Sequence, residues 1–180
     1  MQYQYKKSLV DKEVTFMLEN SILKVRSDEE ELRIPLESIR EIHLKFNRSR
    51  FKGREYRCII KTDLNRKISF SNKFFSGIGN FYDQSDEYTD FLLILHQKMT
   101  EFNPDAVGRS GSKPGIYLLE ILFSLFFLLV FGFLLIAALN LLGLLIIIFL
   151  SIPVIGYIIK NRPGKYKMSD IPYHLLPSRR

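Results

Sequence analysis

Residues 116–159 read IYLLEILFSLFFLLVFGFLLIAALNLLGLLIIIFLSIPVIGYII, and this stretch decides the fold. Its one charged side chain is Glu120. About 20 apolar helical residues cross a hydrocarbon core of about 30 Å. The stretch holds 44 residues, so a single straight helix would be about 66 Å long at about 1.5 Å per residue. Asn140 and Gly143 lie near its middle, so we predict a transmembrane hairpin (116–160) of two helices, over residues 116–139 and 141–159.

The distribution of charge favours a membrane partner over nucleic acid. Of the net charge of +7, residues 1–108 contribute little, with 18 Lys and Arg against 17 Asp and Glu, whereas residues 109–180 hold 8 against 2. The excess flanks the apolar stretch, in Arg109, Lys113, Lys160, Arg162, Lys165 and Lys167. Basic residues beside a span favour the cytoplasmic side, so a hairpin with both chain ends in the cytoplasm fits. The alternative is that these residues only solvate the helix ends.

The first 75 or so residues alternate between apolar and polar side chains, the period of half-buried β-strands. Seven short strands are expected, around Tyr3 and Tyr5, Val14 to Leu18, Leu23 and Val25, Leu32 to Leu36, Ile42 to Phe46, Tyr56 to Ile60, and Ile68 and Phe70. Polar turns separate most of them. This order predicts a small antiparallel sandwich or barrel.

A loop with two glycines is expected over residues 72–84, followed by an amphipathic helix of about 18 residues that packs on the sheet. Asp83 or Ser85 can cap this helix, and Asn103-Pro104 ends it. We therefore predict a β-domain over residues 1–103, a flexible linker over 104–115 that contains Gly108 and Gly111, and a basic cytoplasmic tail over 161–180.

Seven strands followed by one amphipathic helix is the element order of a pleckstrin-homology-like (PH-like) domain. The segment RIPLESIREI (33–42) resembles the middle of bacterial members of that superfamily. The tail segments RPGKY (162–166) and IPYHLLP (171–177) resemble the ends of bacterial membrane proteins that carry such a domain. The chain lacks the tryptophan usual in the last helix of eukaryotic members, so Phe91 or Leu95 would fill that place. The turn that corresponds to the phosphoinositide-binding loop is acidic and polar, so inositol-lipid binding has no residue match.

The sequence offers no constellation typical of catalysis. His43, His96 and His174 lie in three different predicted elements without the spacing of metal ligands, and we expect His43 and His96 on wet surfaces. The single Cys58 lies in phase with Tyr56 and Ile60 and is expected in the core. We therefore expect no enzyme activity, no cofactor and no metal site. The start, MQYQYKKSLV, has no apolar run typical of a signal peptide.

A basic loop between two predicted strands is the candidate contact with lipid. It contains Arg48, Arg50, Phe51, Lys52 and Arg54. Beside an anionic membrane each cation is worth about 1 kcal/mol, and Phe51 could insert at the interface. The alternative is a solvated hairpin tip with Phe51 folded back onto the sheet.

Within the apolar stretch, Glu120 is close enough to the start of the first helix to reach the interface and Lys113. The alternative is a functional role, which is common for an acidic side chain inside a membrane. The small residues Gly132, Ala137, Ala138 and Gly143 permit close helix approach. That approach is consistent either with packing inside the hairpin or with oligomerisation.

These observations predict a multi-pass protein of the bacterial cytoplasmic membrane with both termini in the cytoplasm. Its expected function is binding: a PH-like scaffold domain held at the inner surface for a protein partner or anionic lipid head groups. The alternative is an accessory subunit of a larger membrane complex, for transport or stress response, whose hairpin packs on partner helices. Its partners would be the bilayer, head groups, another protein or a second copy of the chain, and not nucleic acid.

Overall fold

The computed structural model describes residues 1–28, 30–49, 53–77 and 80–177. The chain folds into two compact units. The first, which we call the β-domain, comprises Met1–Ser110 and Gly164–Arg180. The second, the helical hairpin, comprises Gly111–Pro163. The hairpin is therefore an insertion in the sequence of the β-domain.

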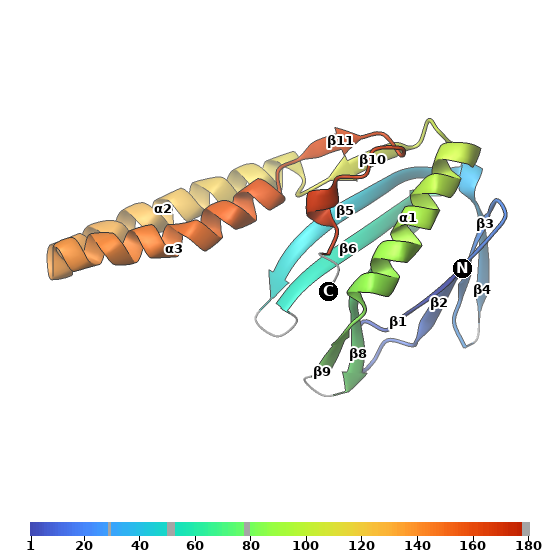
Figure 1. Cartoon of the computed structure of the whole chain (residues 1–180), viewed down its shortest axis with the longest axis horizontal. Helices are drawn as coiled ribbons and strands as arrows, with labels where there is room; N and C mark the ends of the chain where they lie inside the picture. The colour runs from blue at the N-terminus through green and yellow to red at the C-terminus, as the bar shows by residue number, and fades with distance from the viewer. Residues whose placement is uncertain (29, 50–52, 78–79, 178–180) are drawn as a thin grey trace. The chain divides into compact units, whose positions relative to one another are not determined.

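The β-domain contains a four-stranded and a five-stranded sheet (Figure 1). The first has the order β1-β2-β3-β4, with strands β1 (Gln2–Tyr5), β2 (Val14–Glu19), β3 (Ile22–Arg26) and β4 (Glu31–Pro35). The second has the order β11-β10-β5-β6-β7, with strands β5 (Ile39–Ser49), β6 (Gly53–Thr62), β7 (Lys67–Ser71), β10 (Val107–Ser110) and β11 (Gly164–Tyr166). Strands β1 to β7 coincide with the seven predicted strands, and neighbours within each sheet are antiparallel except β5 and β10.

Two short segments complete the corners of the β-domain. A 3-10 turn, η1 (Leu36–Ser38), links β4 to β5, and a second, η2 (Tyr173–Leu175), lies near the end of the chain.

Asn20 and Asn65 have positive φ, at 46° and 58°, in the tight turns that follow β2 and β6. Asparagine tolerates this left-handed conformation better than most residues, so it suits both of these turns.

Helix α1 (Ser85–Phe102) packs its apolar stripe on both sheets, as predicted. The Phe91 ring lies 6.3 Å from that of Phe16 in β2 and 5.5 Å from that of Phe70 in β7, and Tyr3 and Tyr88 complete the cluster. Aromatic rings at such separations contribute beyond the area that they bury. Leu95 is also fully buried, so both residues named as candidates for the tryptophan position, Phe91 and Leu95, lie in the core.

Residues 72–84 differ from the predicted loop. Strands β8 (Lys73–Gly77) and β9 (Asn80–Asp83) form an antiparallel two-stranded sheet between β7 and α1. The backbone N–H of Phe75 also donates to Lys6 O at 2.9 Å, which ties this sheet to the segment after β1. The aromatic pairs Phe74-Phe75 and Phe81-Tyr82 flank two glycines, and segments this short do not distinguish a hairpin from a loop in sequence alone.

The first half of the predicted linker, up to Ser110, and the predicted tail from Gly164 onward belong to the β-domain. Strand β10 pairs in parallel with β5, from Val107 opposite Glu41 to Ser110 opposite Leu44, so 104–115 is not a linker without structure. Strand β11 then pairs antiparallel with β10. Beyond β11, apolar side chains of the tail are buried: Met168, Ile171, Leu175 and Leu176. The tail therefore contributes to the core and is not only a charged extension.

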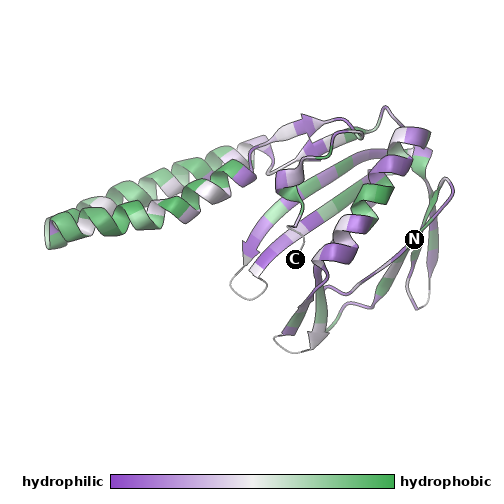
Figure 2. Cartoon of the chain, viewed as in Figure 1, coloured by the Kyte–Doolittle hydropathy of each residue, from purple (hydrophilic) through white to green (hydrophobic). Residues whose placement is uncertain are grey.

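Helices α2 (Pro114–Leu139) and α3 (Leu141–Lys160) form the hairpin, within two residues of the predicted bounds. Asn140 joins them with φ 50° and ψ −124°, which breaks the helical hydrogen bonding at the predicted turn. Pro114 occupies the first turn, where its missing N–H leaves no gap in the helix. In Figure 2 the two helices are hydrophobic along most of their length, whereas the strands alternate between hydrophobic and hydrophilic residues.

Candidate functional site

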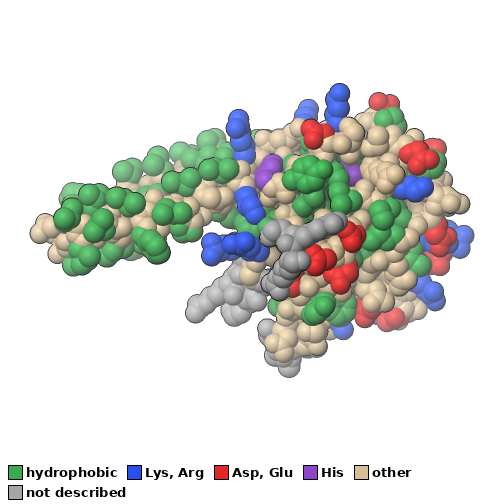
Figure 3. Space-filling model, in the orientation of Figure 1, with side chains coloured by type: hydrophobic (Ala, Val, Ile, Leu, Met, Phe, Trp, Pro, Cys, Tyr) green, Lys and Arg blue, Asp and Glu red, His purple; other side chains and the backbone are tan. Residues whose placement is uncertain are grey.

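The surface of the hairpin is apolar and exposed. The helices hold 26 and 20 residues, or about 39 and 30 Å at about 1.5 Å per residue, and both are long and apolar enough to cross a membrane. Phe133 is 74% exposed and Phe149 75% exposed. Away from its two chain ends, the face of the hairpin seen in Figure 3 carries no Lys, Arg, Asp or Glu side chain. Apolar surface on this scale is suited to lipid rather than water.

Two glycines allow α2 and α3 to approach each other closely. A Cβ at Gly143 would lie 2.2 Å from Leu135 O on α2, and a Cβ at Gly132 would lie 3.3 Å from Ile147 Cδ1 on α3. Ala137 and Ala138 are exposed. Packing within the hairpin therefore accounts for Gly132 and Gly143, whereas the two alanines remain available to another helix.

Replacing Gly143 with leucine is expected to separate α2 from α3. The Leu135 carbonyl is part of the backbone and cannot rotate away, so the helices must move by about 1 Å to reach ordinary contact, at a cost of about 1–3 kcal/mol. Cross-linking of cysteines placed at Gly132 and Ile147 measures the separation. Gly156→Leu is the matched control because a Cβ there meets no atom within 4 Å. Equal cross-linking in both variants would contradict the expectation.

Glu120 joins the two helices through hydroxyl groups. Ser112 Oγ donates to Glu120 Oε2 at 3.3 Å, and Tyr157 OH on α3 donates to Glu120 Oε1 at 3.5 Å. At the same end of the hairpin, Ser112 N–H donates to Asn161 O at 2.8 Å. The predicted approach to Lys113 is not among the described contacts. Glu120 therefore has a structural role at the base of the hairpin.

The predicted flanking cations divide between the two units. Lys113 immediately precedes α2, Lys160 is the last residue of α3, and Arg162 follows it in the hairpin unit. In the β-domain, Arg109 lies in β10 and Lys165 in β11, and Lys167 follows β11. Arg109 is engaged there, since its Nε lies 3.0 Å from Glu41 Oε2.

The predicted head-group loop connects β5 with β6. Arg48 and Arg54 are exposed and directly opposite each other in the strand register. Arg50, Phe51 and Lys52 lie outside the described residues. The structure therefore brings two of the five candidate residues together, at the ends of two long strands.

The predicted exposure of His43 and His96 was wrong, because both side chains are buried. His43 is 7% exposed, because β10 lies beside β5 and places Arg109 next to it. His96 is 1% exposed and is one of the buried residues of α1. Its spacing of four from Leu92 and three from Met99 could have identified this burial. No group of three or more metal-ligating side chains occurs within the described part of the chain.

Cys58 is fully buried, as predicted. Burial raises the pKa of its thiol well above the usual value because the thiolate would lose its hydration. The protonated thiol is a small apolar core residue and a poor nucleophile.

His96 connects α1 to the tail. Its Nδ1 lies 2.8 Å from Leu92 O, which can only accept, so Nδ1 carries the proton. Its Nε2 lies 3.0 Å from the hydroxyl of Tyr166 in β11, which donates to it, and the two rings stack at 5.8 Å. Burial lowers the pKa of His96 to about 4, more than the Leu92 hydrogen bond raises it.

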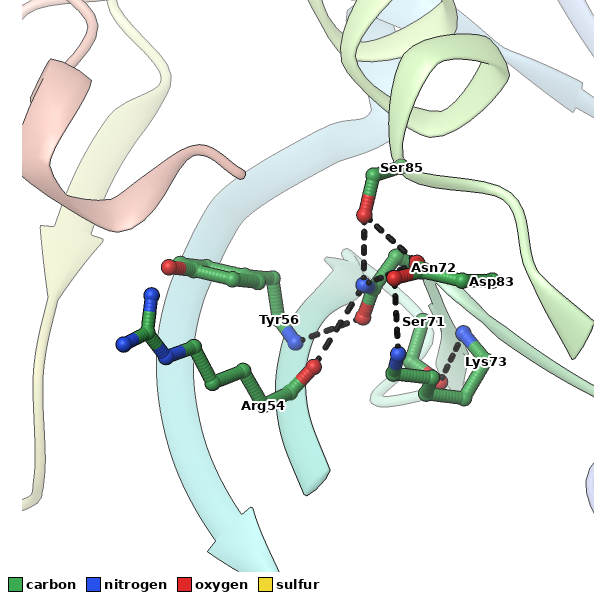
Figure 4. Close-up of polar contacts among 7 residues, drawn as sticks. All are labelled: Arg54, Tyr56, Ser71, Asn72, Lys73, Asp83 and Ser85. Atoms are coloured by element: carbon green, nitrogen blue, oxygen red, sulfur yellow. Dashed lines mark hydrogen bonds and ion pairs between the residues drawn. The ribbon is translucent and has the colours of Figure 1, made fainter. Parts of the chain in front are cut away.

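A polar network at Asn72 fixes the corner where β7, β8 and α1 meet (Figure 4). Asn72 Oδ1 accepts from the backbone N–H of Tyr56 at 2.8 Å, and its Nδ2 donates to Asp83 Oδ1 at 3.0 Å and to Ser85 Oγ at 2.9 Å. Lys73 Nζ lies 3.0 Å from Asp83 Oδ2. Desolvation opposes ionisation of Asp83, but hydrogen bonds from Ser85 and Lys73 outweigh it and lower the pKa.

Asn72→Ala is expected to lower the free energy of unfolding of the β-domain by about 3 kcal/mol. The substitution leaves the buried Tyr56 N–H without its acceptor and removes the donor shared by Asp83 and Ser85. Denaturant unfolding of the detergent-solubilised chain gives the value. Asn80→Ala, at an exposed position of β9, is the control. A loss below 1 kcal/mol, typical of an ordinary surface change of about ±0.5 kcal/mol, would contradict the prediction.

Comparisons of the chain with protein-family models, with curated proteins and with solved structures find no match.

Proposed function

We propose that the protein is a membrane-anchored, non-enzymatic binding module. In this proposal the hairpin spans the cytoplasmic membrane twice, and the β-domain lies at the inner surface, where it presents a surface to a protein or to anionic lipid head groups. The observation that carries the proposal is the pairing of β10 with β11, in which Ser110 lies opposite Gly164. The chain leaves the β-domain along one strand and returns along its neighbour.

This pairing supports a two-pass topology by an argument independent of charge. Adjacent strands of one sheet lie about 4.8 Å apart, so a bilayer cannot separate them. If α2 crosses the membrane, α3 must return across it for Gly164 to reach Ser110. The basic residues at both ends of the hairpin favour the cytoplasm as the shared side.

The element order also supports a PH-like identity for the β-domain. Strands β1 to β7 precede α1 as such a domain requires, and Phe91 and Leu95 fill the core position of the last helix. Strands β8 to β11 and η2 are additions to that order. Strand β10 already pairs with the edge of β5 at residues 41–44. A peptide partner cannot add a strand there, so binding would use other surfaces.

The topology is tested with a cysteine pair and a protease site in the same chain. A Cβ at position 164 would lie 4.0 Å from Ser110 Cβ, within the usual disulfide range of about 3.5–4.5 Å. Ser110→Cys with Gly164→Cys is expected to form a disulfide when isolated membranes are oxidised. A protease site inserted after Asn140 should be cut only from outside the cell, and the fragments should remain linked until reduction.

The control pair is Ser110→Cys with Lys165→Cys, because neighbouring residues of a strand point to opposite faces. These fragments should separate without reduction. Cleavage after Asn140 from the cytoplasmic side, or a C-terminal reporter located outside the cell, would overturn the proposed topology.

A specific feature of the hairpin favours the second candidate function, an accessory subunit of a larger membrane complex. A groove of about 580 Å³ lies between α2 and α3 and is lined almost entirely by apolar side chains, including Phe127, Phe131, Leu150 and Pro153. A partner helix could pack there. Purification in mild detergent distinguishes the two: a stoichiometric partner that survives deletion of residues 1–103 favours the subunit, and its loss favours the β-domain as the binder.

A further inference from the structure

One face of the five-stranded sheet is strongly basic. Ile42, Leu44 and Cys58 point to the core, so their neighbours along β5 and β6 point away from it. On this outward side, which we call the basic face, described cations outnumber carboxylates by six to two. The cations are Lys45, Arg57, Lys61, Lys67, Arg109 and Lys165, and the carboxylates are Glu41 and Glu55.

The two carboxylates lie beneath the cations. Glu41 bridges Lys61 Nζ at 2.5 Å and Arg109 Nε at 3.0 Å, and its side chain is 13% exposed, against 31% and 47% for the two cations. Glu55 pairs with Arg57 Nη2 at 2.9 Å and is 4% exposed, against 28% for the arginine. The carboxylates contact the charged groups of these cations, and the cations are the more exposed partner in each pair.

The strand register places like charges directly opposite each other on the basic face. The cross-strand neighbours are Lys45 and Arg57, Lys61 and Lys67, and Arg109 and Lys165. Like charges in such positions destabilise a sheet. For Lys45, Lys67 and Lys165, no ion pair is found among the described residues. A bound anionic surface would remove the repulsion that these three pairs produce.

The four-stranded sheet provides an internal comparison. Its outward cations lie beside carboxylates: Lys24 Nζ is 2.5 Å from Glu19 Oε2, Arg33 Nε is 2.7 Å from Glu31 Oε1, and Arg26 is opposite Glu31 in the register. Basic excess is therefore a property of one sheet and not of the whole β-domain.

We propose that the basic face docks on the anionic surface of the membrane in which the hairpin is anchored. This inference rests on the proposed function, since it requires the hairpin to span that membrane. Arg109 and Lys165 are each five residues from the nearest helix end, Pro114 and Lys160 respectively, so the chain limits each distance to at most about 18 Å. Each cation near an anionic leaflet adds about 1 kcal/mol of attraction, a fivefold effect. The covalent tether favours this surface over a free polyanion.

Docking is tested by cysteine accessibility in the full chain. Ser69→Cys places a thiol on the exposed basic face in β7, and Gln4→Cys places one on the outward side of the other sheet, in β1. The buried Cys58 does not react. The chain is reconstituted in nanodiscs of phosphatidylcholine, or of phosphatidylcholine with phosphatidylglycerol, and labelled with a water-soluble maleimide.

We expect slower labelling of Ser69→Cys in the anionic discs by about fivefold or more, with no difference between discs for Gln4→Cys. Raising the salt from about 0.1 M to about 1 M shortens the Debye length from about 10 Å to about 3 Å and should abolish the difference. Lys45→Gln, Lys67→Gln and Lys165→Gln together should weaken docking about a hundredfold and restore rapid labelling.

The matched control removes three charges from the other sheet, with Lys24→Gln, Arg26→Gln and Arg33→Gln, and should retain the protection. Both triple variants carry the same net charge. Removal of the like-charge neighbours should not lower stability, which a thermal melt verifies.

Two results would overturn the proposal. One is equal labelling of Ser69→Cys in neutral and anionic discs, with the chain inserted in both. The other is protection by added duplex DNA in neutral discs without protection by anionic lipid, which would assign the basic face to nucleic acid. Failure of the chain to insert into discs would instead contradict the proposed function itself.

Discussion

Replacing Gly108 with valine is expected to release the tail of the protein from the β-domain. A Cβ at Gly108 would lie 2.6 Å from both Tyr166 O and the Tyr166 ring, so any side chain there forces β11 away from β10. Overpacking of this kind costs about 1–3 kcal/mol, occasionally more. The separation also exposes apolar side chains beyond β11, including Met168, Ile171 and Leu175.

Limited trypsin digestion measures this release, because Lys165 and Lys167 lie in the segment that would come free. Cleavage of an open form follows its population when opening is fast, and about 3 kcal/mol corresponds to an increase of about a hundredfold in the cleavage rate. Val107→Leu is the control, since that neighbouring side chain is exposed in the same strand. If Gly108→Val and Val107→Leu are cleaved equally slowly, β11 is not held by close approach to Gly108.

The stability of the β-domain is expected to fall as the pH is lowered from about 6.5 to about 4 because His96 is held neutral in the folded state. The ordinary pKa of 6.5 applies when the chain is unfolded, and burial lowers the folded value to about 4. Between these values the unfolded state binds the additional proton. The free energy of unfolding therefore decreases as pH falls, by about 3 kcal/mol in all, and the contribution is fully present above pH 6.5.

Protonation also changes the hydrogen bonding at His96. Nε2 would become a donor, so the Tyr166 hydroxyl could no longer donate to it and would turn to Ile42 O, which lies 3.5 Å away. Denaturant unfolding at a series of pH values provides the measurement. His96→Gln should flatten the slope between pH 6.5 and 4, whereas His174→Gln, at an exposed position, should leave it unchanged. A slope that is the same in both variants would exclude His96 as its source.

The elements with strong local signals could be predicted from sequence. Strands β1 to β7 alternate cleanly, α1 carries a stripe from Tyr88 to Met99, and the apolar run can only be divided near Asn140. Local periodicity is sufficient in these cases because the spacing of apolar residues within each element indicates which of its side chains are buried.

The elements that were missed depend on partners far away in the sequence. Strand β10, with the sequence VGRS, has no alternation, and its partner β5 precedes it by more than 60 residues. The burial of His43 was missed for the same reason, since the sequence does not indicate that β10 covers that edge. The basic face could not be predicted from the sequence either, because its cations come from five strands and become neighbours only through the sheet order β11-β10-β5-β6-β7.

The pairing of β10 with β11 also determines when the protein can finish folding during synthesis. Residue 166 leaves the ribosome only after both apolar helices have been made, so the last strand of the five-stranded sheet is always available after the hairpin. In a chain whose helices had not inserted, the apolar side chains of residues 116–159 would compete with β11 for the same core. In the proposed two-pass topology, insertion of the hairpin therefore precedes closure of the five-stranded sheet.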